Sequence, residues 1–245
     1  MYTEKQKEFL HTEGYLLLDM KELYPNEFTK AEKSLQNIVD NKKFNILMTN
    51  HSHHDFPIEV HTLIDELGLE RVKNDEIHGE QHKLEVLNEY IVGLDDYTFV
   101  GQNWMYILQQ NKLFQQFKKD IGSFFYDLDE DEVKIMNDRS QFADFTLYLP
   151  GHQTPDHQDG CESGRMMVFL SYFSKDYKEG GGEFKFVDVH GEEKIIIPEY
   201  GKVLVLDFTD KNDVPRNNLH HSVTKVKSFR RYCYLGSLNS IQLNK

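Results

Sequence analysis

The chain has 245 residues, 39% of them hydrophobic and 13% aromatic, so it can bury one substantial core and lacks the composition of a disordered protein. Its 28 basic and 41 acidic residues give a formal net charge of −13, which opposes non-specific attraction to a phosphate backbone or an anionic membrane. These values disfavour nucleic acid and membrane partners. Because no internal repeat or Pro/Gly/Ser-rich linker divides the chain, we expect one domain over 1–245, helix-rich at 1–140 and with a β-rich core at 141–240.

The N-terminus predicts a helix followed by a strand. Residues 6–13 indicate a short helix that ends at Gly14, and the apolar run 15–18 indicates the strand.

The first residues lack the apolar stretch of a secretory signal, and no apolar run approaches the length of a membrane span. Cys161 and Cys233 do not form a zinc motif and favour a reducing compartment without a disulfide framework. We therefore expect a cytoplasmic protein.

The segment from about residue 24 to 138 is more helical in character, because its apolar residues recur at helical spacing. Within it, His51, His53 and His54 form a cluster without the spacing of a closed zinc site, so we interpret them as part of a polar loop. The acidic run 127–132 predicts a solvated loop or the start of a helix.

Short runs rich in β-branched, aliphatic and aromatic residues follow, separated by polar or glycine-containing turns. They predict strands at 166–173, 183–187, 194–197 and 202–208. Glycines at 180–182 and at 191 mark two of the turns, because glycine adopts positive φ at little steric cost. The pattern predicts a mainly β fold, an antiparallel barrel or sandwich, with the N-terminal helices packed against it.

Three residues of this region have the types and spacing of a metal site. His157 and Asp159 are two residues apart, so on an extended strand both side chains lie on the same face. His221 follows Asp159 by 62 residues (221 − 159), which is room for several strands before the chain returns. Two histidines and one carboxylate are the ligand set that non-heme Fe(II) uses when it keeps positions open for a cosubstrate and oxygen. We therefore predict that these three residues bind the metal and form the catalytic centre.

A carboxylate anchor is predicted ten residues after His221. Arg231 lies in the run 230–235, which predicts the next strand, paired against the strand of His221. A guanidinium offers a rigid, bidentate fork to a carboxylate and tolerates burial better than lysine. Tyr172 is a candidate second donor to that carboxylate, and a barrel-filling aromatic is the alternative. His220 is expected on the opposite face of its strand, in an exposed or structural role.

The segment from about residue 145 to 237 resembles the double-stranded β-helix core of the Fe(II)/2-oxoglutarate-dependent oxygenases, nearest in pattern to the prolyl-hydroxylase-like branch. The motifs that carry this resemblance are YLPG at 148–151, HQDG at 157–160, LSYF at 170–173, GGEF at 181–184, PEYG at 198–201 and HSVTKV at 221–226. The resemblance is specific because order, spacing and residue type agree together, and it covers roughly the last 100 residues.

That resemblance implies a jelly-roll fold and a dioxygenase that uses Fe(II), 2-oxoglutarate and O2. Such an enzyme releases succinate and CO2 and hydroxylates an unactivated C–H bond of an amino-acid-like small molecule or a protein side chain. The resemblance also implies that Arg231, Tyr172 and Tyr148 contact 2-oxoglutarate. Packing is the alternative for Tyr148, and Arg230 is the alternative anchor. An aspartate at 159, where halogenating relatives have a small residue, favours hydroxylation or a related oxidation.

Two other classes of protein stay open. A cupin-type metalloenzyme shares the barrel, but it normally uses more histidines and a glutamate after a His-x-His, and Asp159 stands in place of that histidine. A noncatalytic binding protein on the same barrel is expected to have lost a ligand or the anchor arginine, and both are present here. The DNA-dealkylating relatives carry a second arginine shortly after the anchor, and no arginine follows Arg231.

Overall fold

The computed structural model describes residues 2–40, 45–47, 98–100, 111–138, 143–148, 153–158, 165–175, 177, 181–208 and 220–239. The larger of its two sheets contains β1 (Tyr15–Asp19), β2 (Asn45–Leu47), β3 (Thr98–Val100), β4 (Ala143–Tyr148), β6 (Arg165–Tyr172), β9 (Lys202–Asp207) and β11 (Arg231–Asn239). The smaller sheet contains β5 (Thr154–Gln158), β7 (Phe184–Val187), β8 (Glu193–Ile196) and β10 (His220–Val223). The described helices are α1 (Glu4–Glu13), α2 (Met20–Leu23), α3 (Pro25–Asp40), α8 (Lys112–Tyr126) and α9 (Glu130–Asp138).

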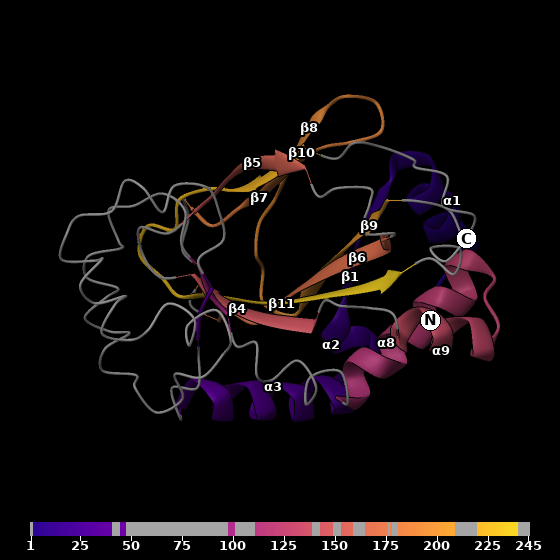
Figure 1. The fold of residues 1–245 in the computed structure, drawn as a ribbon, viewed down its shortest axis with the longest axis horizontal. Helices are drawn as coiled ribbons and strands as arrows, with labels where there is room; N and C mark the ends of the chain where they lie inside the picture. The colour runs from indigo at the N-terminus through magenta and orange to yellow at the C-terminus, as the bar shows by residue number, and fades with distance from the viewer. Residues whose placement is uncertain are drawn as a thin grey trace.

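These elements form three layers (Figure 1). The larger sheet has the order β1-β9-β6-β11-β4-β3-β2, the smaller sheet has the order β5-β10-β7-β8, and every strand pair in both is antiparallel. Helices α3, α8 and α9 lie on the side of the larger sheet that faces away from the smaller one (Figure 1). The prediction of a mainly β fold with added helices is therefore confirmed at this coarse level. None of the described helices is both long and apolar enough to cross a membrane.

The four strands predicted between residues 166 and 208 are present as β6 to β9, but one predicted pairing is wrong. The strand of Arg231, β11, does not pair with the strand of His221, β10. Instead β11 lies between β6 and β4 in the larger sheet, and β10 lies between β5 and β7 in the smaller sheet. The reason is that the chain changes sheet between β9 and β10 and again between β10 and β11, so consecutive strands face each other across the interior.

The segment that looked mainly helical also contains strands. Besides α3, α8 and α9, it supplies β2 and β3, which extend the larger sheet beyond β4. Runs of three residues carry too little period-2 alternation to stand out from the helical pattern around them. The acidic run at 127–132 spans the turn after α8 and the start of α9, whose first turn carries three carboxylates at the positive end of the helix dipole.

The N-terminal helix ends before Gly14, as its sequence predicts, but it begins at Glu4, two residues before the predicted start. Thr3 and Gln6 form a reciprocal capping box at the start of α1, which satisfies backbone donors that have no partner within the helix. Gly14 ends the helix with φ of 76°, a left-handed conformation that glycine adopts without a Cβ clash. The next strand, β1, pairs with β9 at the edge of the larger sheet.

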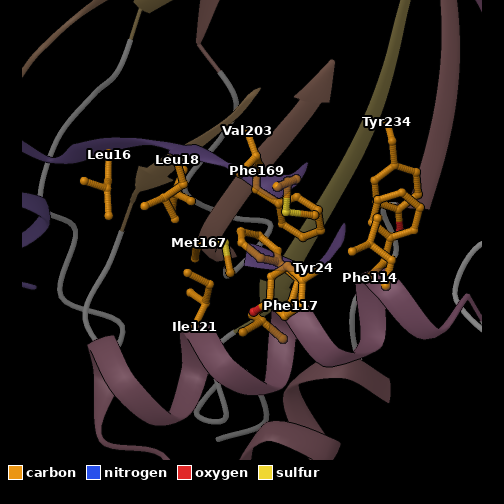
Figure 2. Packing of buried hydrophobic residues seen from close by; sticks show 14 of the residues in the cluster. Leu16, Leu18, Tyr24, Phe114, Phe117, Ile121, Met167, Phe169, Val203 and Tyr234 are labelled. Atoms are coloured by element: carbon orange, nitrogen blue, oxygen red, sulfur yellow. The ribbon is translucent and has the colours of Figure 1, made fainter. Parts of the chain in front are cut away.

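The main hydrophobic core lies between the larger sheet and the helices. Figure 2 shows that α8 directs Phe114, Phe117 and Ile121 toward the sheet, where they meet side chains from β6 and β11. The ring of Phe114 stacks on Tyr234, and Phe117 packs edge-on against Phe169 with 4.9 Å between centroids. All five side chains are fully buried. This layer therefore holds the larger sheet rigidly from its helical side.

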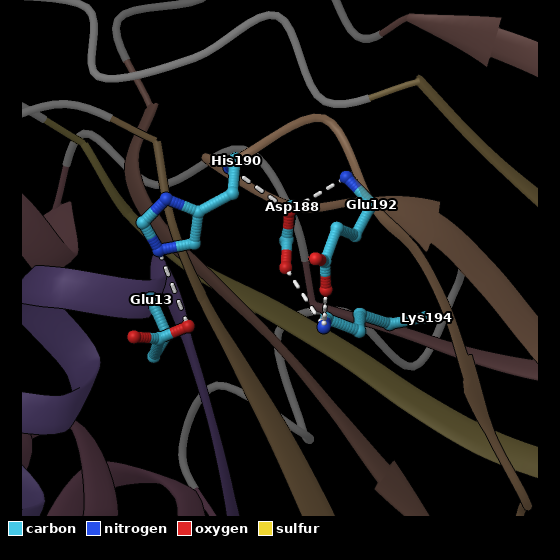
Figure 3. Close-up of polar contacts among 5 residues, drawn as sticks. All are labelled: Glu13, Asp188, His190, Glu192 and Lys194. Atoms are coloured by element: carbon cyan, nitrogen blue, oxygen red, sulfur yellow. Dashed lines mark hydrogen bonds and ion pairs between the residues drawn. The ribbon is translucent and has the colours of Figure 1, made fainter.

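A polar network fixes the turn between β7 and β8 (Figure 3). One carboxylate oxygen of Asp188 accepts hydrogen bonds from two backbone amides of the turn, each 2.9 Å long, and its other oxygen lies 3.1 Å from Lys194 Nζ. Gly191 has φ of 81°, which confirms the turn predicted there. His190 Nε2 lies 3.3 Å from Glu13 Oε2, so the turn is also tied to the end of α1.

Candidate functional site

The interior between the two sheets holds a second cluster of buried side chains, to which both sheets contribute. Its members on the strands are Tyr148, Val168, Leu170, Tyr172, Phe184, Phe186, Leu204, Leu206, Val223 and Cys233. Arg231, at the start of β11, is 1% exposed and lies against Tyr148 and Tyr172 of this cluster. A fully buried guanidinium in a mostly apolar interior is costly unless something compensates its charge, so its surroundings decide what this interior can bind.

The guanidinium of Arg231 is held by aromatic rings and one backbone carbonyl. Its Cζ lies 5.0 Å from the ring centroid of Tyr148 and 5.3 Å from that of Tyr172. Its Nε donates a hydrogen bond of 2.9 Å to the carbonyl of Gly182. Its Nη2 is buried without a hydrogen-bond partner, and no described carboxylate forms an ion pair with it. The hydroxyl of Tyr172 is likewise buried and has no hydrogen-bond partner within the part of the chain that the structure describes.

Two glycines allow the backbone to approach Arg231. Gly182 has φ of +74°, and a Cβ there would lie 3.2 Å from Arg231 Cδ and 3.0 Å from the ring of Phe229. At Gly181, with φ of +128°, a Cβ would lie 2.1 Å from the carbonyl oxygen of Lys225. A side chain at either position would therefore strain the backbone and would also push this backbone segment away from Arg231 and Lys225. The pair predicted as a turn marker also brings the Gly182 carbonyl within reach of the guanidinium.

The titratable groups around Arg231 are neutral, and the guanidinium is charged. Burial raises the pKa of Tyr172 and of Tyr148, and the charge of Arg231 only partly opposes this. Burial also raises the pKa of the Cys233 thiol to about 11. Burial acts to lower the pKa of Arg231, but Cys233, Tyr172 and Tyr148 act in the opposite direction and the pKa is raised. At neutral pH the described groups Tyr148, Tyr172 and Cys233 therefore do not neutralise the charge of Arg231.

The smaller sheet brings two of the predicted metal ligands opposite each other. In the antiparallel pairing of β10 with β5, His221 is the direct partner of His157. His221 is 9% exposed, and its ring lies 5.4 Å from that of Phe184 on β7. Its neighbour His220 is exposed, as predicted, and its Nδ1 lies 3.1 Å from Asp156 Oδ2.

Several predicted residues fall outside the described part of the chain. Asp159 is one of them, and His51, His53 and His54 are others. Among the residues that the structure describes, no three histidine, cysteine or acidic side chains gather as metal ligands would. The assignment of the complete ligand set therefore stays a prediction.

The structure separates the two candidate anchor arginines and adds residues that the motifs did not single out. Arg231 is buried beside Tyr148 and Tyr172, whereas Arg230 is exposed. Cys233 lines the same interior, and its position two residues after Arg231 on a strand was the available signal. Thr154, whose Oγ1 lies 2.7 Å from the hydroxyl of Tyr148, joins β5 to β4, and no sequence pattern indicated that contact.

Comparison with solved structures finds proteins that are similar in structure to this chain. A non-heme α-ketoglutarate-dependent epimerase, SnoN from nogalamycin biosynthesis, aligns over 97% of this chain and 82% of its own, with a TM-score of 0.53 and 8% identity. A Pseudomonas putida prolyl-4-hydroxylase aligns over 96% of this chain and 97% of its own, with a TM-score of 0.48 and 13% identity. For a Trichoplax adhaerens prolyl hydroxylase in complex with a hypoxia inducible factor peptide fragment, the coverages are 96% and 87%, the TM-score is 0.48 and the identity is 12%.

No protein-family model and no curated protein sequence matches the chain. At 8% identity, the likeness to the epimerase is a likeness of fold and does not extend to activity or substrate. The comparison therefore shows that the chain has a fold similar to that of this α-ketoglutarate-dependent epimerase.

Proposed function

We propose that the chain is an Fe(II)- and 2-oxoglutarate-dependent dioxygenase whose strands β4 to β11 form a double-stranded β-helix. Eight strands divided between two facing antiparallel sheets are the arrangement of a jelly roll, and β4-β11-β6-β9 and β5-β10-β7-β8 divide in this way. The part at 1–140 then adds helices and the strands β1, β2 and β3 to one domain.

The observation that carries the proposal is the buried charge of Arg231, which has no carboxylate partner among the described residues. Burying an unpaired ion costs several kcal/mol, and a buried hydroxyl without a partner costs about 1–3 kcal/mol. Arg231 Nη2 and the hydroxyl of Tyr172 are both buried without partners, and the aromatic rings beside them are neutral. One carboxylate would satisfy both groups at once. The terminal carboxylate of 2-oxoglutarate therefore fits the chemistry of this donor set.

The metal would be held by His157, Asp159 and His221. Directly opposed residues on antiparallel strands have Cβ atoms about 4.5–5.5 Å apart, a spacing from which two imidazoles can reach one ion. The pairing of His157 with His221 supports this part of the site. Asp159 follows His157 at the spacing that shares one face of a strand, and its carboxylate completes the set used by Fe(II) oxygenases.

The loaded site would couple oxidative decarboxylation of 2-oxoglutarate, giving succinate and CO2, to hydroxylation of a C–H bond. The chain's own residues bind and orient. Arg231 would hold the terminal carboxylate of 2-oxoglutarate by a charge-assisted contact, and the hydroxyl of Tyr172 would donate a further hydrogen bond to it. Tyr148 covers the guanidinium and, through Thr154, joins the two sheets beside it. The closely packed aromatic surroundings exclude water, which strengthens each electrostatic contact.

We infer that the substrate is an amino-acid-like small molecule or a protein side chain. The P. putida and Trichoplax neighbours are prolyl hydroxylases, and the second was solved with a peptide fragment. The net charge of −13 also disfavours a nucleic acid substrate, because it opposes approach to phosphates.

Anaerobic titration of Fe(II) and 2-oxoglutarate into metal-free protein tests the proposal. The expected result is the weak visible charge-transfer band of the keto acid chelated to iron. His221→Ala should remove the band. His220→Ala is the matched control, because it changes the exposed neighbour on the same strand and should leave the band intact.

Two outcomes of the titration would contradict the proposal. Folded protein that gives no band with Fe(II) and 2-oxoglutarate would point to a different metal or to a binding role. An equal loss of the band in His220→Ala and His221→Ala would indicate a general disturbance of β10. If the band appears, succinate release in the presence of candidate amino acids and peptides identifies the substrate class.

A further inference from the structure

A buried lysine lines a surface cavity between α8 and α9, away from the interior between the sheets. Lys118, on α8, is 2% exposed, although lysine is almost never fully buried without a partner. The cavity has a volume of about 340 Å³. Its other lining residues are Gln115, Lys119, Glu130, Asp131, Val133, Lys134 and Asn137.

The amine of Lys118 has one hydrogen-bond partner, and that partner is neutral. Its Nζ donates a bond of 2.8 Å to the side-chain carbonyl of Asn137 on α9. No described carboxylate lies within ion-pair distance of it. Glu130, which also lines the cavity, is paired with Lys119. Asp131 and Lys134 are the other charged groups that line the cavity. The ammonium form of Lys118 therefore has a neutral hydrogen-bond acceptor but no ionic partner among the described residues.

We propose that Lys118 is a reactive amine that captures small polar aldehydes as imines in the cavity between α8 and α9. A lysine becomes nucleophilic when its surroundings favour the neutral amine over the ammonium, and desolvation does this. Burial lowers the pKa of Lys118 to about 8, with no opposing interaction of comparable size. The amide and charged groups around the cavity suit a polar aldehyde better than an apolar one.

The reaction balances without an oxidant or reductant. The ammonium first gives one proton to solvent, and the lone pair of the neutral Nζ forms a C–N bond to the carbonyl carbon while the C=O π electrons move to oxygen. The two remaining nitrogen protons then leave with that oxygen as water, and a C=N bond forms. Asn137 accepts a hydrogen bond from Nζ and so fixes the orientation of the amine.

Labelling with glycolaldehyde tests the proposal on the full chain. Cyanoborohydride traps the imine, and peptide mass spectrometry measures the rate at each lysine. At pH 7, a pKa of about 8 leaves about one tenth of the amine neutral, a fraction about 200-fold larger than at a lysine with an ordinary pKa near 10.4. Because weaker bases are also weaker nucleophiles, we expect Lys118 to label about tenfold faster than Lys134, the exposed lysine of the same cavity.

Asn137→Asp provides the matched variant. It replaces the amide that contacts Lys118 with a carboxylate of the same size, which would form an ion pair with the ammonium and hold its proton. Labelling of Lys118 at pH 7 should fall about tenfold, while labelling of Lys134 should change little. Circular dichroism confirms that the variant is folded.

Two results would overturn the proposal. One is labelling of Lys118 at the rate of Lys134 or more slowly across pH 6–9, and the other is unaltered labelling of Lys118 in folded Asn137→Asp. Neither depends on Fe(II), 2-oxoglutarate or succinate release, so this test and the test of the proposed dioxygenase succeed or fail separately.

Discussion

The two faces of the larger sheet are built from the same strands but in opposite ways. On β11, Tyr234 faces the helices and stacks on Phe114 of α8, whereas Arg231 and Cys233 face the smaller sheet. On β6, Phe169 faces the helices, whereas Tyr172 faces the interior. The face toward the helices is covered by aromatic side chains. The face toward the smaller sheet carries the buried charge of Arg231, whose Nη2 has no described hydrogen-bond partner.

This difference shows that the two faces of one sheet can have different roles: one face stabilises the fold by packing, and the other carries the groups proposed to bind a ligand. Period-2 alternation sends neighbouring residues of a strand to opposite faces, so each strand contributes to both tasks. The helical face carries the main hydrophobic core, whose side chains pack closely against α8. The inner face contains the buried guanidinium of Arg231 and the buried hydroxyl of Tyr172. Neither group would be favoured there if the face only stabilised the fold. Substitutions on the two faces should therefore change different measured quantities.

The largest expected effect is loss of stability from Phe169→Ala on the helical face. Phe169 is fully buried and packs against Phe117 and Tyr234, so the truncation leaves a cavity in the main core. The free energy of unfolding should fall by about 3–5 kcal/mol. Urea denaturation followed by circular dichroism measures it. Ile135→Ala, at a residue that is 42% exposed, should change the free energy by about 0.5 kcal/mol or less.

Gly181→Ala tests the backbone that supports the inner face. Its Cβ would lie 2.1 Å from the carbonyl oxygen of Lys225, and the residue has φ of +128°, so we expect a loss of about 3 kcal/mol. Gly191→Ala is the control, since Gly191 also has positive φ but nothing lies within 4 Å of its Cβ position. That variant should lose only about 1 kcal/mol in the same denaturation experiment. Equal losses would mean that φ strain alone, and not the close approach, sets the cost.

Arg231→Met should affect binding far more than folding. It removes a buried charge and replaces it with an apolar side chain, a change that is often neutral or stabilising for the fold. We expect 2-oxoglutarate affinity to fall about 100-fold or more, measured by isothermal titration calorimetry with Fe(II) under anaerobic conditions. Arg230→Met, at the exposed neighbour, should leave the affinity within about twofold. A larger effect at Arg230 would move the anchor to that residue and remove the contrast between the two faces.

Lys118→Met gives the smallest expected effect and a defined pH dependence. Below about pH 8 both the folded and the unfolded chain carry the ammonium, so the burial penalty is fully present. Between about pH 8 and 10.5 the unfolded chain binds more protons at this residue, so the stability of the unaltered protein rises with pH. At pH 7 the variant should therefore be more stable by about 1–2 kcal/mol, a gain that shrinks toward pH 10. Thermal unfolding across pH 7–10 measures this, and a pH-independent difference would contradict the buried ammonium.

Much of the fold could be predicted because it depends on local chemistry. The helix at 6–13, its stop at Gly14, the turn at Gly191 and the four strands between 166 and 208 follow from caps, glycine conformations and strand-forming runs. The three-residue strands β2 and β3 were missed, since such short runs carry too little alternation to outweigh the helical pattern around them. The pairing of β11 was predicted wrongly, because neighbours in a sequence with two sheets need not be neighbours in either sheet.

For the candidate site, the sequence by itself determined which residue types are present and which of them can share one face of a strand. It indicated His157, Asp159, His221 and Arg231 by type, order and spacing. Only the tertiary structure set His221 directly opposite His157, buried Arg231 beside Tyr148 and Tyr172, and left Arg230 exposed. The physical reason is that burial and charge compensation depend on strands far apart in the chain, so no local pattern of residues encodes them.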